Sequence, residues 1–473
     1  MVTLRSGSRT ADASLHSNGE AQTNGKSDSN FTKEKAGGSN MKYVVFGSLV
    51  LDLLGFTVIL PLFPALLEYY SKHDSSGLYN YILGAVGYFQ AALGVPPRFN
   101  SVLFGGFLGS VFSLLQFLSS PVTGALSDVY GRKPVLIATL LGMGGSYAVW
   151  SVSSNFAVFV LARVLGGLSK GNVSLGYSIM TDILDTKTRA MGMALIGVAF
   201  SIGFIVGPAI GVVFSKWGTS GWFAASAVYA LTLTALNVLF VIVCFKETLP
   251  KSNRFKSLGS GLADAWSLIN PGSLFSFRPI KGISDKERSS LVQLGLINFL
   301  FLFVYSGLEF TLTFVTHLQH RYDHMAQAYM FVYLGLVMVV IQGGYMRRVG
   351  EGKEKMVAAR GIMVMVPAFP LIGWSYNNWM LYAGLTLYAV GSSLLVPCLT
   401  GLASVHGPPS QKGALLGIWR SLGALARATG PLTAAAGFWF MGSGWCYSVG
   451  GVALMLPLVL LRRWNSAATT KQD

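Results

Sequence analysis

The sequence predicts an all-α membrane protein in which twelve transmembrane helices form two pseudo-symmetric six-helix bundles. Composition is the first reason. Hydrophobic residues make up 52% of the 473 residues and charged residues only 11%, whereas soluble globular proteins carry about 25% charged residues. The second reason is a series of apolar segments long enough to cross a hydrocarbon layer of about 30 Å. The third is a repeat between the two halves of the chain. A water-soluble enzyme is therefore not expected.

The first 40 residues are expected to be a disordered tail. They are rich in Ser, Asn, Gly and Thr and contain few large apolar residues. They therefore cannot bury enough surface to offset the entropy lost on ordering. They also lack the basic start, apolar stretch and small-residue cleavage site of a signal peptide.

After this tail, apolar segments follow one another, six in each half. They lie at 43–68, 102–126, 134–153, 156–184, 190–216 and 221–245, and at 291–316, 326–346, 356–375, 379–404, 413–438 and 442–461. We therefore expect a first bundle over 41–246, a linker over 247–290, a second bundle over 291–464 and a tail over 465–473. Apolar residues at helical spacing predict an interfacial helix over 257–270 of the linker.

Residues 78–95 are a further uncharged segment that is long enough to span a membrane. Three glycines, together with Asn80 and Gln90, weaken it as a span, and a span here would invert every later loop. We expect it to lie on the membrane at the outer face.

Charge placement predicts the orientation. Of the 35 Lys and Arg residues, 27 lie in the termini and in the loops of one side, four lie in the loops of the other side, and four lie within spans. Because translocation of Lys and Arg is unfavourable, both termini are expected to be cytoplasmic. The net charge of +16 then reflects topology, and binding to nucleic acid is not expected.

Two features repeat along the chain. Gly124 recurs as Gly344, 220 residues later, and Gly207-Pro208 recurs as Gly430-Pro431, 223 residues later. Parallel repeats of this kind are common in transporters, where the binding site lies at the midplane between them.

The turn after the second span reads GALSDVYGRKP, from Gly124 to Pro134. Gly124 permits close helix approach, Gly131 can reverse the chain in the left-handed conformation, and Pro134 suits the first turn of a helix. The Asp128 carboxylate can bind the N-terminal end of a helix or Arg132. The pattern indicates a gating turn rather than an ordinary basic loop.

Small residues form a ridge in the fifth span. Gly203, Gly207 and Gly211 recur every fourth residue, beside Pro208. The ridge lets another helix approach closely, and Pro208 permits a bend because it removes a backbone hydrogen bond. Both a hinge and plain close packing fit this spacing.

Six ionisable residues lie within the spans. They are Asp52, Arg163, Lys170, Glu309, Arg420 and Arg427. Each costs about 2.5–3.5 kcal/mol or more when it faces lipid, so each should face a cavity or a partner. In the fourth and eleventh spans the two cations are seven residues apart and share a helix face. Four cations against two carboxylates leave a surplus that favours an anionic ligand.

We therefore assign the four cations to substrate binding and the two carboxylates to proton coupling. Glu309 is the preferred proton site and Asp52 the second candidate. Two alternatives stay open: Arg163 pairs structurally with Asp52 or with a loop acid, and Arg420, which is nearer the inner end, extends its charge to the membrane surface.

Other chemistry is not indicated. The three cysteines are far apart and form no CxxC pair, which argues against a disulfide framework or a zinc site. His317, His320 and His324 are attributed to a wet outer loop. No catalytic triad or nucleotide-binding loop occurs, so we expect no cofactor, no metal, no enzymatic activity and no ATP-driven pumping.

These motifs resemble the major facilitator superfamily. GALSDVYGRKP looks like the signature between its second and third helices, and Arg163 in LARVLGGLSKG resembles the fourth-helix motif associated with proton coupling. GFIVGPAIG resembles the fifth-helix antiporter motif. Asp52-Leu-Leu-Gly55 with Pro61 and Pro64 is similar to the drug:proton antiporters of the tetracycline-efflux branch.

Longer stretches, such as NSVLFGGFLGSVFSLLQFLSSPVTGALSD, look closer still to animal tetracycline transporter-like proteins. The resemblance covers residues 42 to 462 and implies twelve helices, alternating access and movement of organic anions or drug-like solutes. One departure stands out. The second-half counterpart, GYMRRVGEGKEK, has Arg347 and Arg348 but lacks the Asp, so the inner gate is expected to be asymmetric.

The first functional hypothesis is a secondary active transporter of organic anions, a proton-coupled or exchange antiporter. It predicts that Lys170→Ala or Arg427→Ala abolishes flux without unfolding the protein. The alternatives are a uniporter of neutral or cationic drug-like solutes and a non-transporting membrane scaffold or receptor.

The expected partners are a small organic anion, protons or a counter-anion, and the lipid bilayer, and the protein is expected to be a monomer. We favour the plasma membrane, and the resemblance leaves internal membranes, including the nuclear envelope, open.

Overall fold

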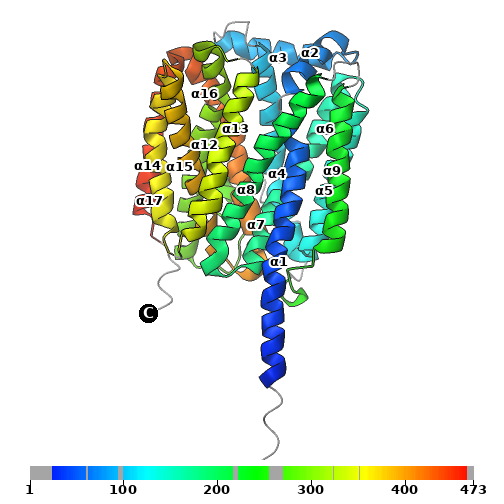
Figure 1. The fold of residues 1–473 in the computed structure, drawn as a ribbon, viewed down its shortest axis with the longest axis vertical. Coiled ribbons are helices and arrows are strands. Elements are labelled where there is room, and N and C mark those ends of the chain that lie inside the picture. Colours follow the sequence, from blue (N-terminus) through cyan, green and yellow to red (C-terminus); the bar gives the residue numbers. More distant parts are fainter. Residues whose placement is uncertain are drawn as a thin grey trace, which may run out of the picture. The chain divides into compact units, whose positions relative to one another are not determined.

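The computed structural model describes residues 24–59, 62–93, 100–216, 222–254, 270–322, 324–350 and 352–465. Contacts divide the chain into two units, Met1–Asn40 and Met41–Asp473. The second unit is a bundle of long helices (Figure 1). Most of the predicted interfacial helix over 257–270 lies outside the described residues, as do 1–23 and 466–473.

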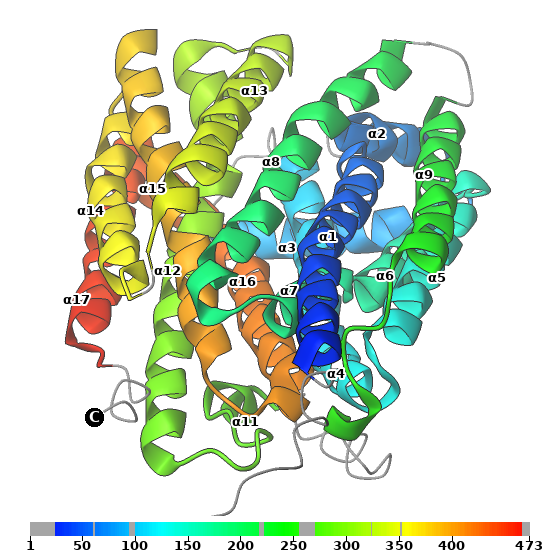
Figure 2. The same cartoon turned by 60° about the horizontal axis from the view of Figure 1, so that its bottom comes forward.

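Within the residues that the structure describes, the first half of the chain supplies nine α-helices, coloured blue to green in Figure 2. They are α1 (Asn24–Thr57), α2 (Phe63–His73), α3 (Leu78–Leu93), α4 (Asn100–Tyr130), α5 (Arg132–Ser151), α6 (Phe156–Ser169), α7 (Asn172–Ile183), α8 (Thr186–Lys216) and α9 (Trp222–Cys244). A 3₁₀ turn, η3 (Lys251–Asn253), follows α9.

The second half is also helical. It consists of α11 (Pro271–Phe275), α12 (Asp285–His320), α13 (His324–Val340), η4 (Ile341–Tyr345), η5 (Met346–Arg348), α14 (Glu354–Gly373), α15 (Asn378–Val405), η6 (Pro409–Gln411), α16 (Lys412–Ala453) and α17 (Met455–Arg463). The part of the chain that the structure describes contains no strand. The all-α membrane fold predicted from the sequence is therefore confirmed.

Nine stretches among the described residues are long and apolar enough to cross a membrane. The last of them, Pro409–Arg463, is broken at Gly442, whose φ of 76° is not helical. It therefore contains both of the segments predicted at 413–438 and 442–461. The count of twelve spans stays a prediction.

The first predicted segment differs from the structure at both ends. The first predicted segment, 43–68, is split because α1 ends at Thr57 and α2 begins at Phe63. The reason is the pair Pro61 and Pro64, which lack the N–H groups that a continuous helix needs. At its other end, α1 begins at Asn24, inside the predicted tail.

The fourth predicted segment, 156–184, is also split. The chain leaves the helix after Ser169 and begins α7 at Asn172. At this break Gly171 lies so close to Thr123 of α4 that a Cβ atom would collide with that side chain. The backbone break therefore allows close contact between the fourth segment and α4.

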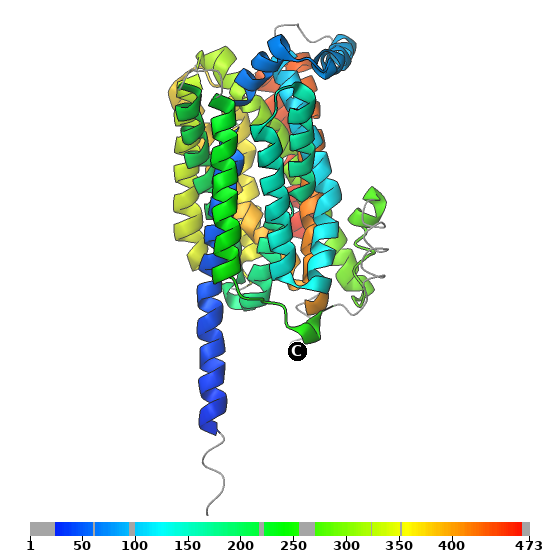
Figure 3. The ribbon, with the colours of Figure 1, turned by 90° about the vertical axis from the view of Figure 1, so that its right-hand side faces the viewer.

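The uncharged segment at 78–95 forms α3, which lies across the end of the bundle with α2 (Figure 3). Its 16 residues are fewer than the roughly 20 that a spanning helix needs. Asp74 holds it in place, because its carboxylate accepts hydrogen bonds from the backbone N–H groups of Tyr79 (3.1 Å) and Phe156 (3.1 Å). Slight burial opposes ionisation, but these bonds and those from Ser76 outweigh it and lower the pKa of Asp74 to about 2.

The glycine ridge of α8 lies against α1. Cβ atoms at Gly203 and Gly207 would collide with Leu53 and Thr57, respectively, and the Thr57 hydroxyl donates a hydrogen bond to the Gly203 carbonyl at 2.7 Å. In the second half, Gly430 of α16 lies equally close to Phe303 of α12. The two halves thus repeat one packing scheme, in which a Gly-Pro helix lies against the first helix of its half.

Candidate functional site

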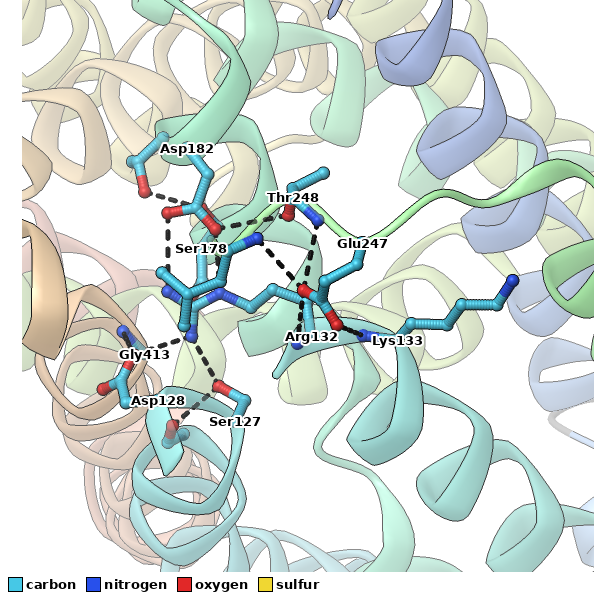
Figure 4. Close-up of polar contacts among 12 residues, drawn as sticks. Ser127, Asp128, Arg132, Lys133, Ser178, Asp182, Glu247, Thr248 and Gly413 are labelled. Atoms are coloured by element: carbon cyan, nitrogen blue, oxygen red, sulfur yellow. Dashed lines mark hydrogen bonds and ion pairs between the residues drawn. The ribbon is translucent and has the colours of Figure 1, made fainter. Parts of the chain in front are cut away.

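The turn between α4 and α5 is built around a buried arginine. Gly131 has a φ of 105°, a conformation that favours glycine, and it reverses the chain so that Arg132 points inward. The Arg132 side chain is fully buried and forms ion pairs with Asp128 (2.7 Å) and Asp182 (2.8 Å). Figure 4 shows this group. We call Asp128, Arg132 and Asp182 the latch.

Asp128 joins the two halves of the chain. Its two carboxylate oxygens accept hydrogen bonds from the N–H groups of Gly413 (2.9 Å) and Ala414 (2.7 Å), in the first turn of α16. These amides have no partner within their own helix, and the residue before α16, Gln411, makes no capping bond. Asp128 therefore caps α16 from the other half, with a charge that suits the positive end of a helix.

Close backbone contact accompanies this cap. A Cβ atom at Gly124 would collide with the carbonyl oxygen of Gly413. Farther along the same pair of helices, the Ser421 hydroxyl donates to the Phe117 carbonyl at 2.7 Å. The two halves are thus closed against each other along α4 and α16. We call the end of the bundle at which Asp128 meets α16 the basic end, because the Lys- and Arg-rich loops lie there.

A second seam between the halves joins α8 to α13 and η4. Gln342, in the π-helical turn η4, lies close to Gly197 and accepts a hydrogen bond of 3.4 Å from the Ser201 hydroxyl. Gly344, the repeat counterpart of Gly124, has no atom within 4 Å of its Cβ position, and Arg347 and Arg348 are exposed. The charged latch therefore belongs to the first half, and a neutral amide takes its place in the second seam.

Two acids beside Arg132 were not predicted from the sequence: Asp182 of the latch, and Glu247. Asp182 lies near the end of the fourth predicted span, 156–184, and Glu247 follows the sixth. Glu247 accepts hydrogen bonds from the N–H groups of Arg132 (2.9 Å) and Lys133 (3.1 Å), so it caps α5. Asp182 lies at the end of a predicted span and Glu247 directly after one, and the scarcity of acids in the spans is the signal that singles them out.

A larger residue at Gly124 should prevent closure of the basic end. In Gly124→Val the added side chain meets the Gly413 backbone, which cannot move aside as a flexible side chain would. We expect spin labels at the exposed positions Tyr130 and Val405 to lie farther apart and with a broader distance distribution. Gly145→Val is the matched control, because nothing lies within 4 Å of that Cβ position. An unchanged distance in Gly124→Val would contradict this account of the gate.

The ionisable residues within the spans gather between the halves, and one pair of them is neutralised. Lys170 Nζ lies 2.6 Å from Asp52 Oδ2, and both side chains are buried. The alternative in which Asp52 pairs with Arg163 is therefore wrong for this conformation. The Lys170 ammonium also lies 4.4 Å from the centre of the Phe56 ring, and Gln116 donates to the Lys170 carbonyl, which lies at the break between α6 and α7.

Arg163 has an aromatic neighbour instead of an acid. Its guanidinium lies 4.7 Å from the centre of the Phe112 ring, and that ring packs against Phe56 at 5.5 Å. Among the described residues Arg163 forms no ion pair. Two cations thus flank one pair of aromatic rings, and only one of the cations is compensated by a carboxylate.

Arg420 and Arg427 of α16 carry unused hydrogen-bond donors. Arg420 lies 5.5 Å from the centre of the Phe200 ring in α8. Among the described residues, its buried Nε atom and the buried Nη2 atom of Arg427 have no hydrogen-bond partner. Both arginines are within electrostatic range of Tyr177 of α7, so they face the first half of the chain.

Glu309 completes the charged group. Its side chain is exposed, yet the Tyr305 hydroxyl donates to it at 3.2 Å, and Arg427 lies within electrostatic range. It therefore borders accessible space beside α16. When the Asp52–Lys170 pair is discounted, three arginines and one glutamate remain between the halves. The positive surplus predicted from the sequence persists, but it is carried by the arginines and not by Lys170.

A neutral histidine is buried near the start of α16. His406, 1% exposed, lies 3.0 Å from the Leu402 carbonyl through Nδ1 and 3.1 Å from the Ser290 hydroxyl through Nε2. Nδ1 therefore carries the proton and Nε2 accepts. Burial lowers the pKa of His406 below its ordinary 6.5, Lys412 adds to this, and the Leu402 carbonyl and Glu287 oppose it.

His406 should make the folded protein less stable in acid. Because its folded pKa is depressed, the contribution to stability is complete above pH 6.5 and is lost as the pH falls toward the folded pKa. We expect the melting temperature to fall between pH 7 and pH 5, and His406→Gln to reduce this fall. The matched control is His73→Gln, at an exposed position. Equal pH dependence in all three proteins would contradict the assignment.

Comparison with known proteins adds to this geometry. The family model described as "Major Facilitator Superfamily" matches residues 45–431. Human major facilitator superfamily domain-containing protein 10 is 44% identical over 434 residues, which cover 90% of this chain and 93% of the human protein. The class C tetracycline resistance protein of Escherichia coli is 25% identical over 91% of this chain and 99% of its own length.

Two solved structures of transporters have a similar fold. The crystal structure of the human organic anion transporter MFSD10 (TETRAN) superposes with a TM-score of 0.85 at 43% identity, over 90% of this chain and 99% of that one. The proton:xylose symporter XylE superposes with a TM-score of 0.64 at 12% identity, over 90% and 96%. At that identity the second match concerns the fold alone.

Proposed function

Since this chain belongs to the major facilitator superfamily and is a membrane transporter rather than an enzyme, we propose that the solute it moves is an organic anion. One observation carries the proposal: Arg420 and Arg427 present buried N–H groups without partners, on one face of one helix. Buried donors without partners are costly, and an anion between the halves would satisfy them. The description of the human relative as an organic anion transporter supports this substrate class.

Aromatic side chains complete the proposed site. Phe200 lies beside Arg420, and Phe56 and Phe112 lie between Lys170 and Arg163. Such rings offer apolar contact to the organic part of an anion. The proposed substrate residues are therefore Arg420 and Arg427 first, then Arg163, with Lys170 available only when it leaves Asp52.

Transport would occur by alternating access, with Glu309 and Asp52 as the proton-coupling residues or with a counter-anion in exchange. In the orientation that the charge distribution predicts, both termini are cytoplasmic, and the latch closes the cytoplasmic side. The Gly-Pro helices α8 and α16 and the latch would then form the moving parts. We propose a monomer as the functional unit.

The test is flux into proteoliposomes. Naphthalene-2-sulfonate is a suitable solute because its charge does not titrate and the ring is fluorescent. We expect uptake that depends on the protein and changes when a pH gradient is imposed. Uptake of a cationic dye that survives both removal of the arginines and collapse of the gradient would instead favour a uniporter. Absence of flux for every solute would favour a scaffold.

A further inference from the structure

The negative charge of Asp52 is compensated by the ammonium of Lys170. One carboxylate oxygen of Asp52 contacts Lys170 at 2.6 Å. The other, Oδ1, is buried and has no hydrogen-bond partner among the described residues. Most buried carboxylates accept several hydrogen bonds. The charge of Asp52 therefore rests on a single cation.

Among the described residues, no second charged side chain contacts the Asp52 carboxylate, although Arg163 of α6 lies within electrostatic range of Lys170. From α5, Tyr147 lies within electrostatic range of Asp52 and Arg163, and its buried hydroxyl has no partner among the described residues. From α16, Arg420 lies within electrostatic range of Lys170. The polar contacts that α8 and α9 make with α1 come from the Gly203 carbonyl and Asn237, and neither group titrates.

Lys170 is also a group that the transported anion would engage. It lies between the halves, beside the Phe56 ring and within range of Arg420. The Lys170 ammonium contacts Asp52 in this structure, so an anion that draws the ammonium toward itself draws it away from that carboxylate. Asp52 would then remain buried without a counter-charge, which is strongly unfavourable. Protonation of Asp52 removes that cost.

We propose that binding of an anion to Lys170 and binding of a proton to Asp52 form one coupled event, so that the anion and the proton cross the membrane in the same direction. This inference rests on the proposed function. The coupling is reciprocal by thermodynamic necessity, so protonation of Asp52 strengthens binding of the anion to the same degree. The bound proton also reduces the net charge that must pass through the protein.

Whether the proton binds together with the solute or in place of it depends on the protein group for which they compete. A cationic solute and a proton compete for the same carboxylate, which gives antiport. An organic anion and the Asp52 carboxylate compete for the same ammonium, and the proton then binds together with the anion. The tetracycline-type resemblance implies antiport, whereas the Asp52–Lys170 pair implies cotransport of the anion and the proton.

Proton uptake upon binding tests the proposal directly. The purified full-length protein in weak buffer at pH 7 is mixed with naphthalene-2-sulfonate in the presence of a pH indicator dye. We expect about one proton to be taken up per bound anion, and the affinity to fall by up to about tenfold per pH unit as the pH is raised. In Glu68→Gln, which removes an acid at an exposed position of α2, uptake should persist, since Asp52 is unchanged. In Asp52→Asn binding should persist while uptake from this site is lost.

The wild-type measurement keeps the test decisive even when Asp52→Asn folds poorly. Binding with no proton uptake and with an affinity independent of pH would overturn the inference and leave the proposed function standing. Proton release upon binding would overturn it as well. Failure of naphthalene-2-sulfonate and of other organic anions to bind would overturn the proposed function, and the inference with it.

Discussion

Arg427→Gln should reduce organic-anion flux at least tenfold while leaving the melting temperature nearly unchanged. A hydrogen bond to a charged group contributes about 1.5–3 kcal/mol, and each 1.4 kcal/mol corresponds to about tenfold in affinity. Arg427 forms no ion pair among the described residues, so its removal breaks no buried pair. Glu309 keeps the hydrogen bond from Tyr305. Uptake of naphthalene-2-sulfonate and thermal unfolding in detergent measure the two effects.

Arg347→Gln is the matched control for this variant. It removes the same charge from an exposed position at the basic end and should change neither flux nor stability. Flux at the wild-type level in Arg427→Gln would remove Arg427 from the site. The structure also changes the expectation for Lys170→Ala. That variant leaves Asp52 without a counter-charge, so we now expect it to destabilise the fold, and its loss of flux would be ambiguous.

Arg132→Met should destabilise the protein by about 3–5 kcal/mol, the cost typical of breaking a buried ion pair. The variant leaves Asp128 and Asp182 buried without their shared partner. It also weakens the cap on α16, because the orientation of Asp128 depends on Arg132. Thermal unfolding measures the loss of stability, and the distance between labels at Tyr130 and Val405 reports on opening of the basic end.

Lys133→Met is the control for Arg132→Met. The neighbouring lysine is half-buried, and its ammonium contacts the Ile242 carbonyl and, among the described residues, no carboxylate. We expect a change of less than about 1 kcal/mol, as for most exposed charges. Equal destabilisation by the two variants would show that the turn tolerates no change in charge and would refute the specific role of Arg132.

The sequence was sufficient for the fold and for the motif that forms the latch. The resemblance to the major facilitator superfamily, to its tetracycline-efflux branch and to an animal member is confirmed by the family model and by the relatives. The motif from Gly124 to Pro134 was informative because turn geometry, close packing and a carboxylate coincide within eleven residues. Each of these depends on local chemistry, which a sequence displays directly.

The partner of Asp52 was not predictable in the same way. Arg163 and Lys170 are seven residues apart, so helical periodicity places both on the face toward α1 and gives no basis for a choice. The choice depends on the break after Ser169, where α6 ends and the Lys170 side chain contacts Asp52. Asp182 and Glu247 were missed for a related reason, because their contacts with Arg132 and with α5 join segments about 50 and 115 residues apart.

One property of α16 has a mechanical consequence. The same helix begins at the amides that Asp128 holds and continues, with no proline before Pro431, through Arg420 and Arg427. A stiff rod of this kind moves as one piece, so displacement of its first turn also displaces both guanidinium groups. A solute that pulls on these arginines therefore also pulls on the first turn of α16, where Asp128 of the other half binds the helix.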